Sequence, residues 1–186
     1  MRIIGGNFKG KKIYLPIDKN TRPLRDMVKE AIFNLIEHSK KINIKVENSK
    51  VLDLFSGSGS FGLECISRKA KKVLFIENYP KASKILSKNI LHLNVQEQCE
   101  VLNQNCFEFL SDQKESSVKF EIIFIDPPFK EDKINNIINE IKDSKILHKN
   151  GIMIIHRHKL DNLELSNKLK ILDTRNYGIS KITIGN

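Results

Sequence analysis

The sequence has few cysteines and no long apolar run, and these absences exclude several classes of protein. Its three cysteines, Cys65, Cys99 and Cys106, are an odd number without metal-ligand spacing, so we expect neither a disulfide framework nor a zinc site. No apolar run approaches the roughly 18 residues that a membrane-spanning helix needs. Residues 1–6 lack the apolar segment of a signal peptide. We therefore expect a cytoplasmic protein with no bound metal and no membrane partner.

The chain nevertheless holds enough apolar residues for a sizeable core, and its charge is uneven. Hydrophobic residues make up 40% of its 186 residues, which excludes disorder over the whole chain and fits one domain spanning residues 1–186. Residues 1–50 hold 12 basic and 5 acidic side chains, whereas residues 51–186 hold 20 and 17. A basic front end indicates a polyanionic partner such as nucleic acid, although a generally lysine-rich composition explains the same excess.

Residues 1–48 predict an N-terminal unit that precedes the main fold. Residues 2–15 are expected to form a β-hairpin, because short apolar runs flank a turn rich in glycine. A helix is expected after Pro23, since apolar residues recur there at the spacing of one helical face, namely Val28, Ala31, Ile32, Leu35 and Ile36.

Residues 49–186 predict the core of the fold. Apolar runs suited to strands cover residues 51–55, 73–76, 99–102, 122–125 and 152–155, and two final antiparallel strands are expected around 171–172 and 179–184. Helical patterns cover residues 60–69, 80–94, 105–112 and 132–142. Because strands alternate with helices, we expect an α/β, Rossmann-like, doubly wound sheet that is mostly parallel and covered on both faces.

Ligands of such sheets bind beyond the carboxyl ends of the strands, so the residues after each strand are the candidate site. Gly57, Gly59 and Gly62 follow the first core strand with the spacing of a dinucleotide-binding loop. This spacing alone does not separate a nicotinamide cofactor from S-adenosylmethionine. Phe55 and Ser56 belong to the same candidate cofactor loop.

Polar side chains at three strand ends narrow the choice of cofactor. Asp53, close before the glycine loop, is a poor neighbour for a pyrophosphate and a good one for the ammonium group of S-adenosylmethionine; capping of a helix or loop is its alternative role. Glu77, followed by Asn78, can accept hydrogen bonds from both ribose hydroxyls, its alternative being a solvated charge. Asn105 and Cys106 can approach an adenine edge or form a simple turn.

The motif Asp126-Pro127-Pro128-Phe129 follows the fourth core strand and carries the predicted chemistry. The prolines fix the backbone and remove two donors, so the Asp126 carboxylate and the Pro127 carbonyl can both accept from one amino group. Phe129 offers a flat face for an aromatic base; a rigid turn is the alternative reading of the motif. Two acceptors favour a pyramidal nitrogen aimed at a methyl group, so catalysis would be mostly alignment and electrostatics. Such a base must be flipped out or unpaired.

Four blocks of the sequence resemble the RsmD family, bacterial class I methyltransferases that act on N2 of one guanine in small-subunit (16S) ribosomal RNA. The blocks are residues 2–12, Thr21–Asn34, Asp53–Arg68 and Phe124–Phe129. The resemblance implies a monomer that binds S-adenosylmethionine at Ser56–Gly59 and places Glu77 on the ribose. It also implies ribosomal RNA as the partner, and we expect that RNA to be part of a small-subunit assembly particle.

The resemblance further implies that the N-terminal hairpin and the region after it lie near the RNA. The candidate phosphate contacts are Lys9, Lys11, Lys12, Arg22, Arg25 and Lys29, each of which could equally be a solvated charge. Two positions depart from the family pattern: Lys29 stands where an arginine is usual, and His156 stands where a glutamate is common. A structural role and a role in the pocket both remain open for His156.

Three other functions remain alternatives. An adenine-N6 methyltransferase acting on RNA or DNA would use the same Asp126–Phe129 motif, but a DNA enzyme usually needs a target-recognition domain. A nicotinamide oxidoreductase would explain the glycine loop and leave that motif unexplained. An RNA-binding protein with a degenerate cofactor pocket would not need the intact acidic residues Asp53, Glu77 and Asp126.

Overall fold

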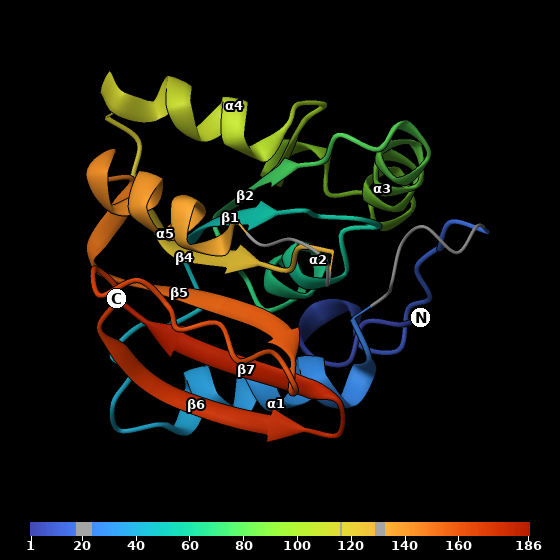
Figure 1. The fold of residues 1–186 in the computed structure, drawn as a ribbon. Coiled ribbons are helices and arrows are strands. Elements are labelled where there is room, and N and C mark those ends of the chain that lie inside the picture. Colours follow the sequence, from blue (N-terminus) through green and yellow to red (C-terminus); the bar gives the residue numbers. More distant parts are fainter. Residues whose placement is uncertain (18–23, 116, 129–132) are drawn as a thin grey trace.

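A seven-stranded sheet forms the centre of the computed structural model, which describes residues 1–17, 24–115, 117–128 and 133–186 (Figure 1). The strand order is β3-β2-β1-β4-β5-β7-β6. The strands are β1 (Lys50–Leu54), β2 (Lys72–Ile76), β3 (Cys99–Leu102), β4 (Phe120–Ile125), β5 (Leu147–His158), β6 (Ile171–Tyr177) and β7 (Ser180–Gly185). Strands β1 to β5 pair in parallel, whereas β7 is antiparallel to both β5 and β6. The predicted mostly parallel sheet with an antiparallel C-terminal strand is therefore confirmed.

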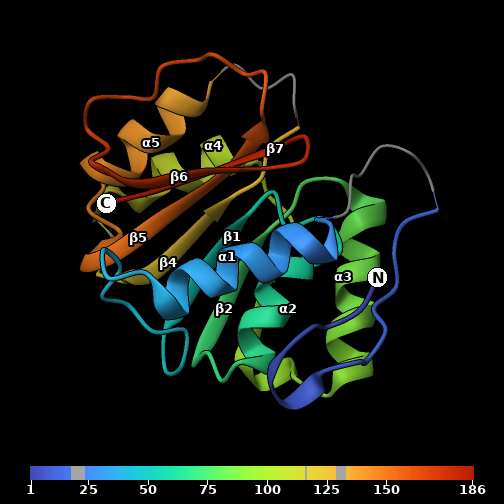
Figure 2. The same cartoon turned by 90° about the horizontal axis from the view of Figure 1, so that it is seen from below.

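Helices cover both faces of the sheet, as expected for a doubly wound fold (Figure 2). One face carries α1, α2 and α3, and the other carries α4 and α5. The bounds are α1 (Asp26–His38), α2 (Ser60–Ser67), α3 (Pro80–Leu93), α4 (Cys106–Ser111) and α5 (Ile134–Asp143), with 3-10 turns at Gly6–Phe8, Gln96–Gln98 and Asp112–Glu115. In the described part of the chain, none of these helices has the length and apolarity that crossing a membrane requires.

Strand β4 shows how the sequence supplies two cores at once. Ile122 and Phe124 pack in the core under α1 and α2. Ile123 and Ile125 pack in the core under α4 and α5. Since successive side chains of a strand point to opposite faces, a strand buried on both faces is a continuous apolar run, which is why the sequence predicts this element well.

The predicted N-terminal β-hairpin is present as a short antiparallel pairing. Its two arms pair at an antiparallel bridge between Arg2 and Lys12, backbone hydrogen bonds join them on both sides of that bridge, and the tip closes as the 3-10 turn Gly6–Phe8. The backbone of Gly6 lies at φ +71°, a conformation that suits a turn and interrupts a strand. The backbone N–H of Ile4 donates to the side chain of Glu64 on α2 instead of to a second strand.

Candidate functional site

The candidate residues gather because β1 lies between β2 and β4. Leu54, the last residue of β1, pairs with Ile76 of β2 on one side and with Ile125 of β4 on the other. The loops that follow these three parallel strands consequently leave the sheet at one edge. The topology thus brings the glycine loop, Glu77 and Asp126 to the same end of the molecule, as the sequence predicts.

The loop after β1 is a tight turn with an open outer side. Its backbone is left-handed at Phe55, with φ +60°, and at Gly57, with φ +56°. The Ser56 hydroxyl donates to the carbonyl of Asp53 at 2.6 Å and so fixes the start of the turn. A Cβ atom placed on Gly57 would have no atom within 4 Å. The loop therefore presents bare backbone to open space, which allows a ligand to approach closely.

Glu77 joins the loops after β1 and β2. Its carboxylate accepts the backbone N–H of Gly57 at 2.6 Å and that of Tyr79 at 2.8 Å. The residue is 8% exposed, so it is not the solvated strand-end charge considered as its alternative role. Because this carboxylate faces the outer turn at Gly57, it lies where a ligand of the loop would meet it.

Asp53 caps α2, which is the alternative that its sequence position left open. One carboxylate oxygen accepts the backbone N–H of Gly62, in the first turn of α2, at 3.0 Å. The side chain is buried, and burial raises the pKa of Asp53 well above its usual range. The charges of Asp126 and Glu77 raise that pKa further, while the hydrogen bond from Gly62 opposes the rise. A cation that reached this carboxylate would relieve the cost of its burial.

The residues after β3 also have a clear local role. The Asn105 side chain accepts the backbone N–H of Phe107 at 2.9 Å and caps the start of α4. Cys106 is buried, and Asn78 beside Glu77 is exposed. Within the described ranges, no three His, Cys, Asp or Glu side chains form a group that could hold a metal ion.

The Asp126 motif contains a contact that sequence reasoning missed. The Asp126 carboxylate lies 2.8 Å from Nδ1 of His156 on β5, and Nε2 of that imidazole lies 2.8 Å from the hydroxyl of Ser180 on β7. Pro127 is buried and Pro128 is exposed, while Phe129 lies outside the described residues. Ser180 carries no motif, so only the pairing of β5 with β7 could have identified it.

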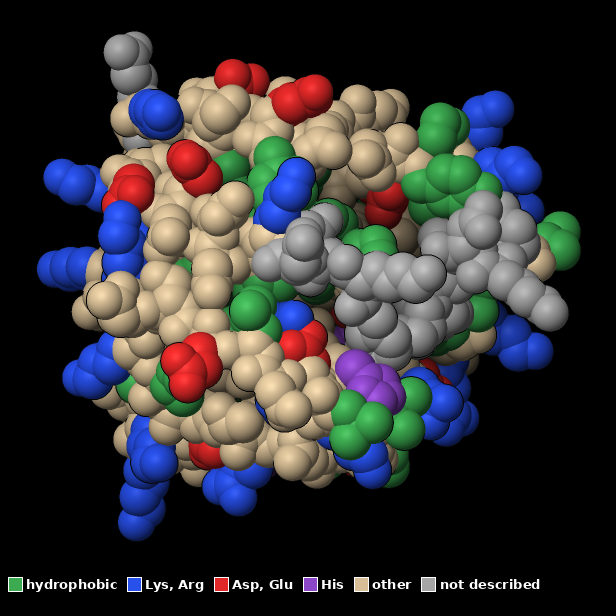
Figure 3. All heavy atoms as spheres, viewed as in Figure 1, with side chains coloured by type: hydrophobic (Ala, Val, Ile, Leu, Met, Phe, Trp, Pro, Cys, Tyr) green, Lys and Arg blue, Asp and Glu red, His purple; other side chains and the backbone are tan. Residues whose placement is uncertain are grey.

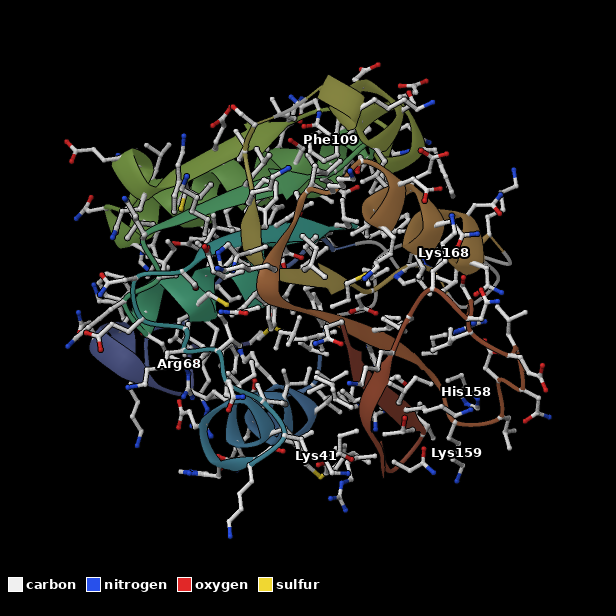
Figure 4. All side chains as sticks on the ribbon, turned by 90° about the vertical axis from the view of Figure 1, so that its left-hand side faces the viewer. Lys41, Arg68, Phe109, His158, Lys159 and Lys168 are labelled. Carbon is white, nitrogen blue, oxygen red and sulfur yellow. The ribbon has the colours of Figure 1, made fainter. Side chains whose placement is uncertain are left out.

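Among the candidate phosphate contacts that the structure describes, all but Lys29 are exposed. Lys9, Lys11, Lys12 and Arg25 are exposed, and Arg22 lies outside the described residues. Figure 3 shows that Lys and Arg side chains spread around the edge of the face that it displays. His158, at the end of β5, and the exposed Lys159 that follows it lie far from Arg68 in Figure 4.

The expectation for Lys29 is wrong, because this side chain is fully buried. Its Nζ donates to the backbone carbonyl of Arg2 at 2.7 Å and lies 3.6 Å from the carboxylate of Glu64. Burial lowers the pKa of Lys29, whereas the charges of Glu64 and Asp26 oppose that shift. The helical pattern could have indicated this, since position 29 lies beside Val28 and one turn before Ile32 and Phe33 on the buried side of α1.

Glu64 is the centre of a set of contacts that hold the N-terminal segment. Its two carboxylate oxygens accept the backbone N–H groups of Ile4 at 2.8 Å and Gly5 at 2.7 Å. Arg68 Nε donates to the same carboxylate at 3.0 Å, and Arg68 lies beside the N-terminal turn in Figure 4. We call Glu64, Lys29, Ile4, Gly5 and Arg68 the N-terminal clasp.

Asn89 on α3 ties the same segment to the glycine loop. Its side-chain oxygen accepts the backbone N–H of Tyr14 at 2.7 Å. Its amide group donates to the carbonyl of Tyr14 at 3.0 Å and to the carbonyl of Ser58 at 2.9 Å. The segment that carries the basic residues is therefore linked to the candidate cofactor loop through the side chain of Asn89.

A cavity of about 600 Å³ lies elsewhere, between the C-terminal ends of α1 and α2. Its lining includes Ile36, Ile44, Val46, Glu47 and Arg68. Val46 and Glu47 precede β1, so this cavity is at the amino end of the parallel strands. It does not belong to the site at the carboxyl ends.

Comparison with known proteins identifies the family. A family model described as conserved hypothetical protein 95 matches residues 1–186. A protein of Haemophilus influenzae named ribosomal RNA small subunit methyltransferase D is 33% identical over 96% of this chain and 90% of its own length. The chain belongs to the RsmD family. A second relative in the RsmD family, with the same name and from Buchnera aphidicola, is 34% identical over 99% of this chain and 87% of its own length.

A solved structure supports the assignment of this chain to the RsmD family. The candidate methyltransferase yhhF of Escherichia coli superposes with a TM-score of 0.83 at 27% identity. The match covers 100% of this chain and 96% of that protein. The whole described fold, including its N-terminal segment, is thus shared with a known structure.

Proposed function

We propose that this chain transfers a methyl group from S-adenosylmethionine to the exocyclic N2 amine of a guanine in small-subunit ribosomal RNA. The observation that carries the proposal is the position of Asp126 at the edge of the sheet where the open glycine loop lies. The names of the relatives supply the substrate class, since they describe ribosomal RNA methyltransferases of the small subunit.

The loop residues fit S-adenosylmethionine. The bare backbone at Gly57 leaves room for a ligand, and the carboxylates of Glu77 and Asp53 border the loop. A buried carboxylate whose pKa is raised, as at Asp53, is stabilised by a neighbouring cation. This favours a ligand with an ammonium group over one with a pyrophosphate. Glu77 would hold the ribose hydroxyls, and Ser56–Gly59 would surround the rest of the cofactor.

The protein's part in the reaction is alignment. When bound, S-adenosylmethionine supplies a methyl group attached to a positively charged sulfonium sulfur. Loss of that methyl group turns the sulfonium into a neutral thioether, which is the leaving group. Asp126 and the Pro127 carbonyl accept the two hydrogens of the target amine, so that its nitrogen lone pair points away from the base. Holding the reacting groups in this geometry removes much of the entropic barrier. After transfer the nitrogen loses one proton, which passes to the Asp126 carboxylate or to water.

The RNA partner is supported by the exposed basic residues of the N-terminal segment. Lys9, Lys11, Lys12 and Arg25 can contact phosphates, and such contacts position an enzyme on RNA without reading its sequence. Because this surface is small, we propose a partly assembled small-subunit particle as the substrate, in which other groups orient the target.

The test is methyl transfer from labelled S-adenosylmethionine to small-subunit particles from a strain that lacks this gene, with the methylated nucleoside identified by mass spectrometry. N2-methylguanosine is the expected product. N6-methyladenosine would contradict the proposed base, and transfer to no RNA at all would contradict the proposed function.

Two variants connect the product to the site. Asp126→Ala should reduce transfer by roughly a hundredfold or more while the affinity for S-adenosylmethionine changes only a few-fold. Asp143→Ala removes another carboxylate, exposed on α5 and paired with Lys168 at 2.6 Å, and should leave transfer unchanged. Full activity in Asp126→Ala would exclude the proposed mechanism.

A further inference from the structure

Three side chains form a hydrogen-bonded row that leads away from the candidate site. Asp126 Oδ1 lies 2.8 Å from His156 Nδ1, and His156 Nε2 lies 2.8 Å from the Ser180 hydroxyl. The exposed fraction falls along the row, from 14% for the Asp126 side chain to 3% for that of His156. Ser180 is buried too. Only Asp126 therefore reaches the surface where a substrate can touch it.

The row follows from the register of β5 and β7. His156 pairs with Ile182, and Ser180 lies two residues before Ile182 on β7. Side chains two residues apart on a strand share a face, so Ser180 is the diagonal neighbour of His156. Ile154 and Ile182 both pack in the core under α1 and α2, which places the imidazole on that face.

The chemistry of the three groups gives the row a direction. An ionised carboxylate can only accept hydrogen bonds, so Nδ1 of His156 carries a hydrogen that it donates to Asp126. In the neutral imidazole the other nitrogen is an acceptor, and it accepts the hydroxyl hydrogen of Ser180. Each contact then joins one donor to one acceptor.

We propose that His156 is a positioning residue for methyl transfer: it holds the Asp126 carboxylate in one orientation, and Ser180 holds the imidazole. The inference rests on the proposed function of Asp126 as the acceptor for the target amine. His156 does not touch the substrate and acts through Asp126. A third group that orients a reacting side chain is a recurring arrangement in enzymes.

Single variants test the role of the imidazole. His156→Leu removes the donor and should lower kcat roughly 10- to 100-fold, the range expected for loss of a hydrogen bond to a charged group. His156→Asn keeps a donor near the position of Nδ1 and should retain kcat within about fivefold of the wild type. The KM for RNA and the affinity for S-adenosylmethionine should stay the same in both variants, because the imidazole contacts neither.

His148→Leu is the matched control, since His148 lies at the opposite end of the same strand. Its kcat should equal that of the wild type. Thermal unfolding of each variant separates a loss of positioning from a loss of fold. A merely structural role for His156 predicts that activity follows stability, so Leu and Asn variants of equal stability would have equal kcat, and that result would overturn the inference.

A double-mutant cycle tests the outer end of the row. Ser180→Ala should lower kcat in the wild-type background and have no further effect in His156→Asn, because the shorter amide does not reach Ser180. Equal effects of Ser180→Ala in both backgrounds would contradict the role of Ser180.

The tautomer of His156 gives a readout that does not depend on the identity of the substrate. Nitrogen-15 NMR of the wild-type protein should show the hydrogen on Nδ1, and a hydrogen found only on Nε2 would overturn the inference. If the wild type methylates no RNA while this tautomer is present, the proposed function fails and the arrangement of the row stands.

Discussion

The N-terminal clasp makes a strong prediction, because one carboxylate holds several donors in a place that water does not reach. Glu64 and Lys29 are both fully buried, and their charged atoms lie 3.6 Å apart. Glu64→Gln keeps the size of the side chain and removes its charge. The new amide has one accepting oxygen, whereas the carboxylate accepts from Ile4, Gly5 and Arg68 through two oxygens. One donor of this set is therefore left facing an NH₂ group.

The expected loss is large for a single substitution. Removing one partner of a buried ion pair typically destabilises a protein by about 3–5 kcal/mol, because the other charge stays buried without compensation. Such a loss compares with a total stability of about 5–15 kcal/mol. The matched control is Glu100→Gln, whose partner Lys72 lies at 2.8 Å while both side chains are about half exposed, at 49% and 52%. Exposed pairs contribute only about 0–1 kcal/mol.

Urea unfolding followed by circular dichroism measures both variants under the same conditions. We expect Glu64→Gln to lower the free energy of unfolding several times more than Glu100→Gln does. Adding Lys29→Met to Glu64→Gln should recover part of the loss, since the buried charge that faced Glu64 is then gone. If Glu64→Gln cost no more than Glu100→Gln, the clasp would not be a buried ionic contact and the reasoning would be refuted.

Three further predictions concern the site and its partner. Asp53→Asn should raise the thermal midpoint at neutral pH and weaken S-adenosylmethionine binding: the native pKa of Asp53 is raised above its ordinary value of 3.8, so the wild type loses stability as pH rises through the native pKa. Below about pH 4 the advantage of the variant should disappear, and a pH-independent difference in midpoint would contradict this account. Gly57→Ala should weaken cofactor binding more than Gly10→Ala, the control that also has positive φ and open space around it; equal titration curves would exclude Gly57 from the cofactor loop. The affinity for RNA should fall steeply with salt, and a flatter slope is expected when alanine replaces Lys9, Lys11 and Lys12; an unchanged slope in a binding assay would show that these lysines do not contact phosphate.

The sequence predicts the sheet and its helices because burial imposes a period on both. The stripe Ile134, Ile137, Ile138 and Ile141 is fully buried in α5, as its spacing indicates. Strand β3 has the predicted bounds, Cys99–Leu102. The bounds of β5 are less well predicted, since the strand extends from Leu147 to His158 and only residues 152–155 are a continuous apolar run. Its C-terminal end pairs with β7 and its first residue, Leu147, pairs with Phe120 of β4, and both partners are distant in sequence.

Partners of charged side chains are harder to predict, because they depend on contacts between distant elements. Lys29 and Arg25 lie on the same short stretch and have the same sign of charge, yet one is buried and the other is exposed. The difference arises from Glu64, which lies on another helix. Its carboxylate lies near the ammonium group of Lys29 and offsets part of the energetic cost of burying that charge. Composition therefore identifies a basic segment without showing which of its residues face solvent.

The same dependence on distant contacts explains why the N-terminal segment forms so little sheet. The backbone N–H groups of Ile4, Gly5 and Tyr14 donate to Glu64 on α2 and Asn89 on α3, so a longer β-ladder is not needed to pair them. Helix α2 begins where the glycine loop ends, and Asn89 also donates to Ser58 within that loop. A segment held in this way cannot move without changing contacts of the loop. Bringing an exposed basic segment and a ligand loop together through two buried side chains is thus a result of packing, which neither motif shows by itself.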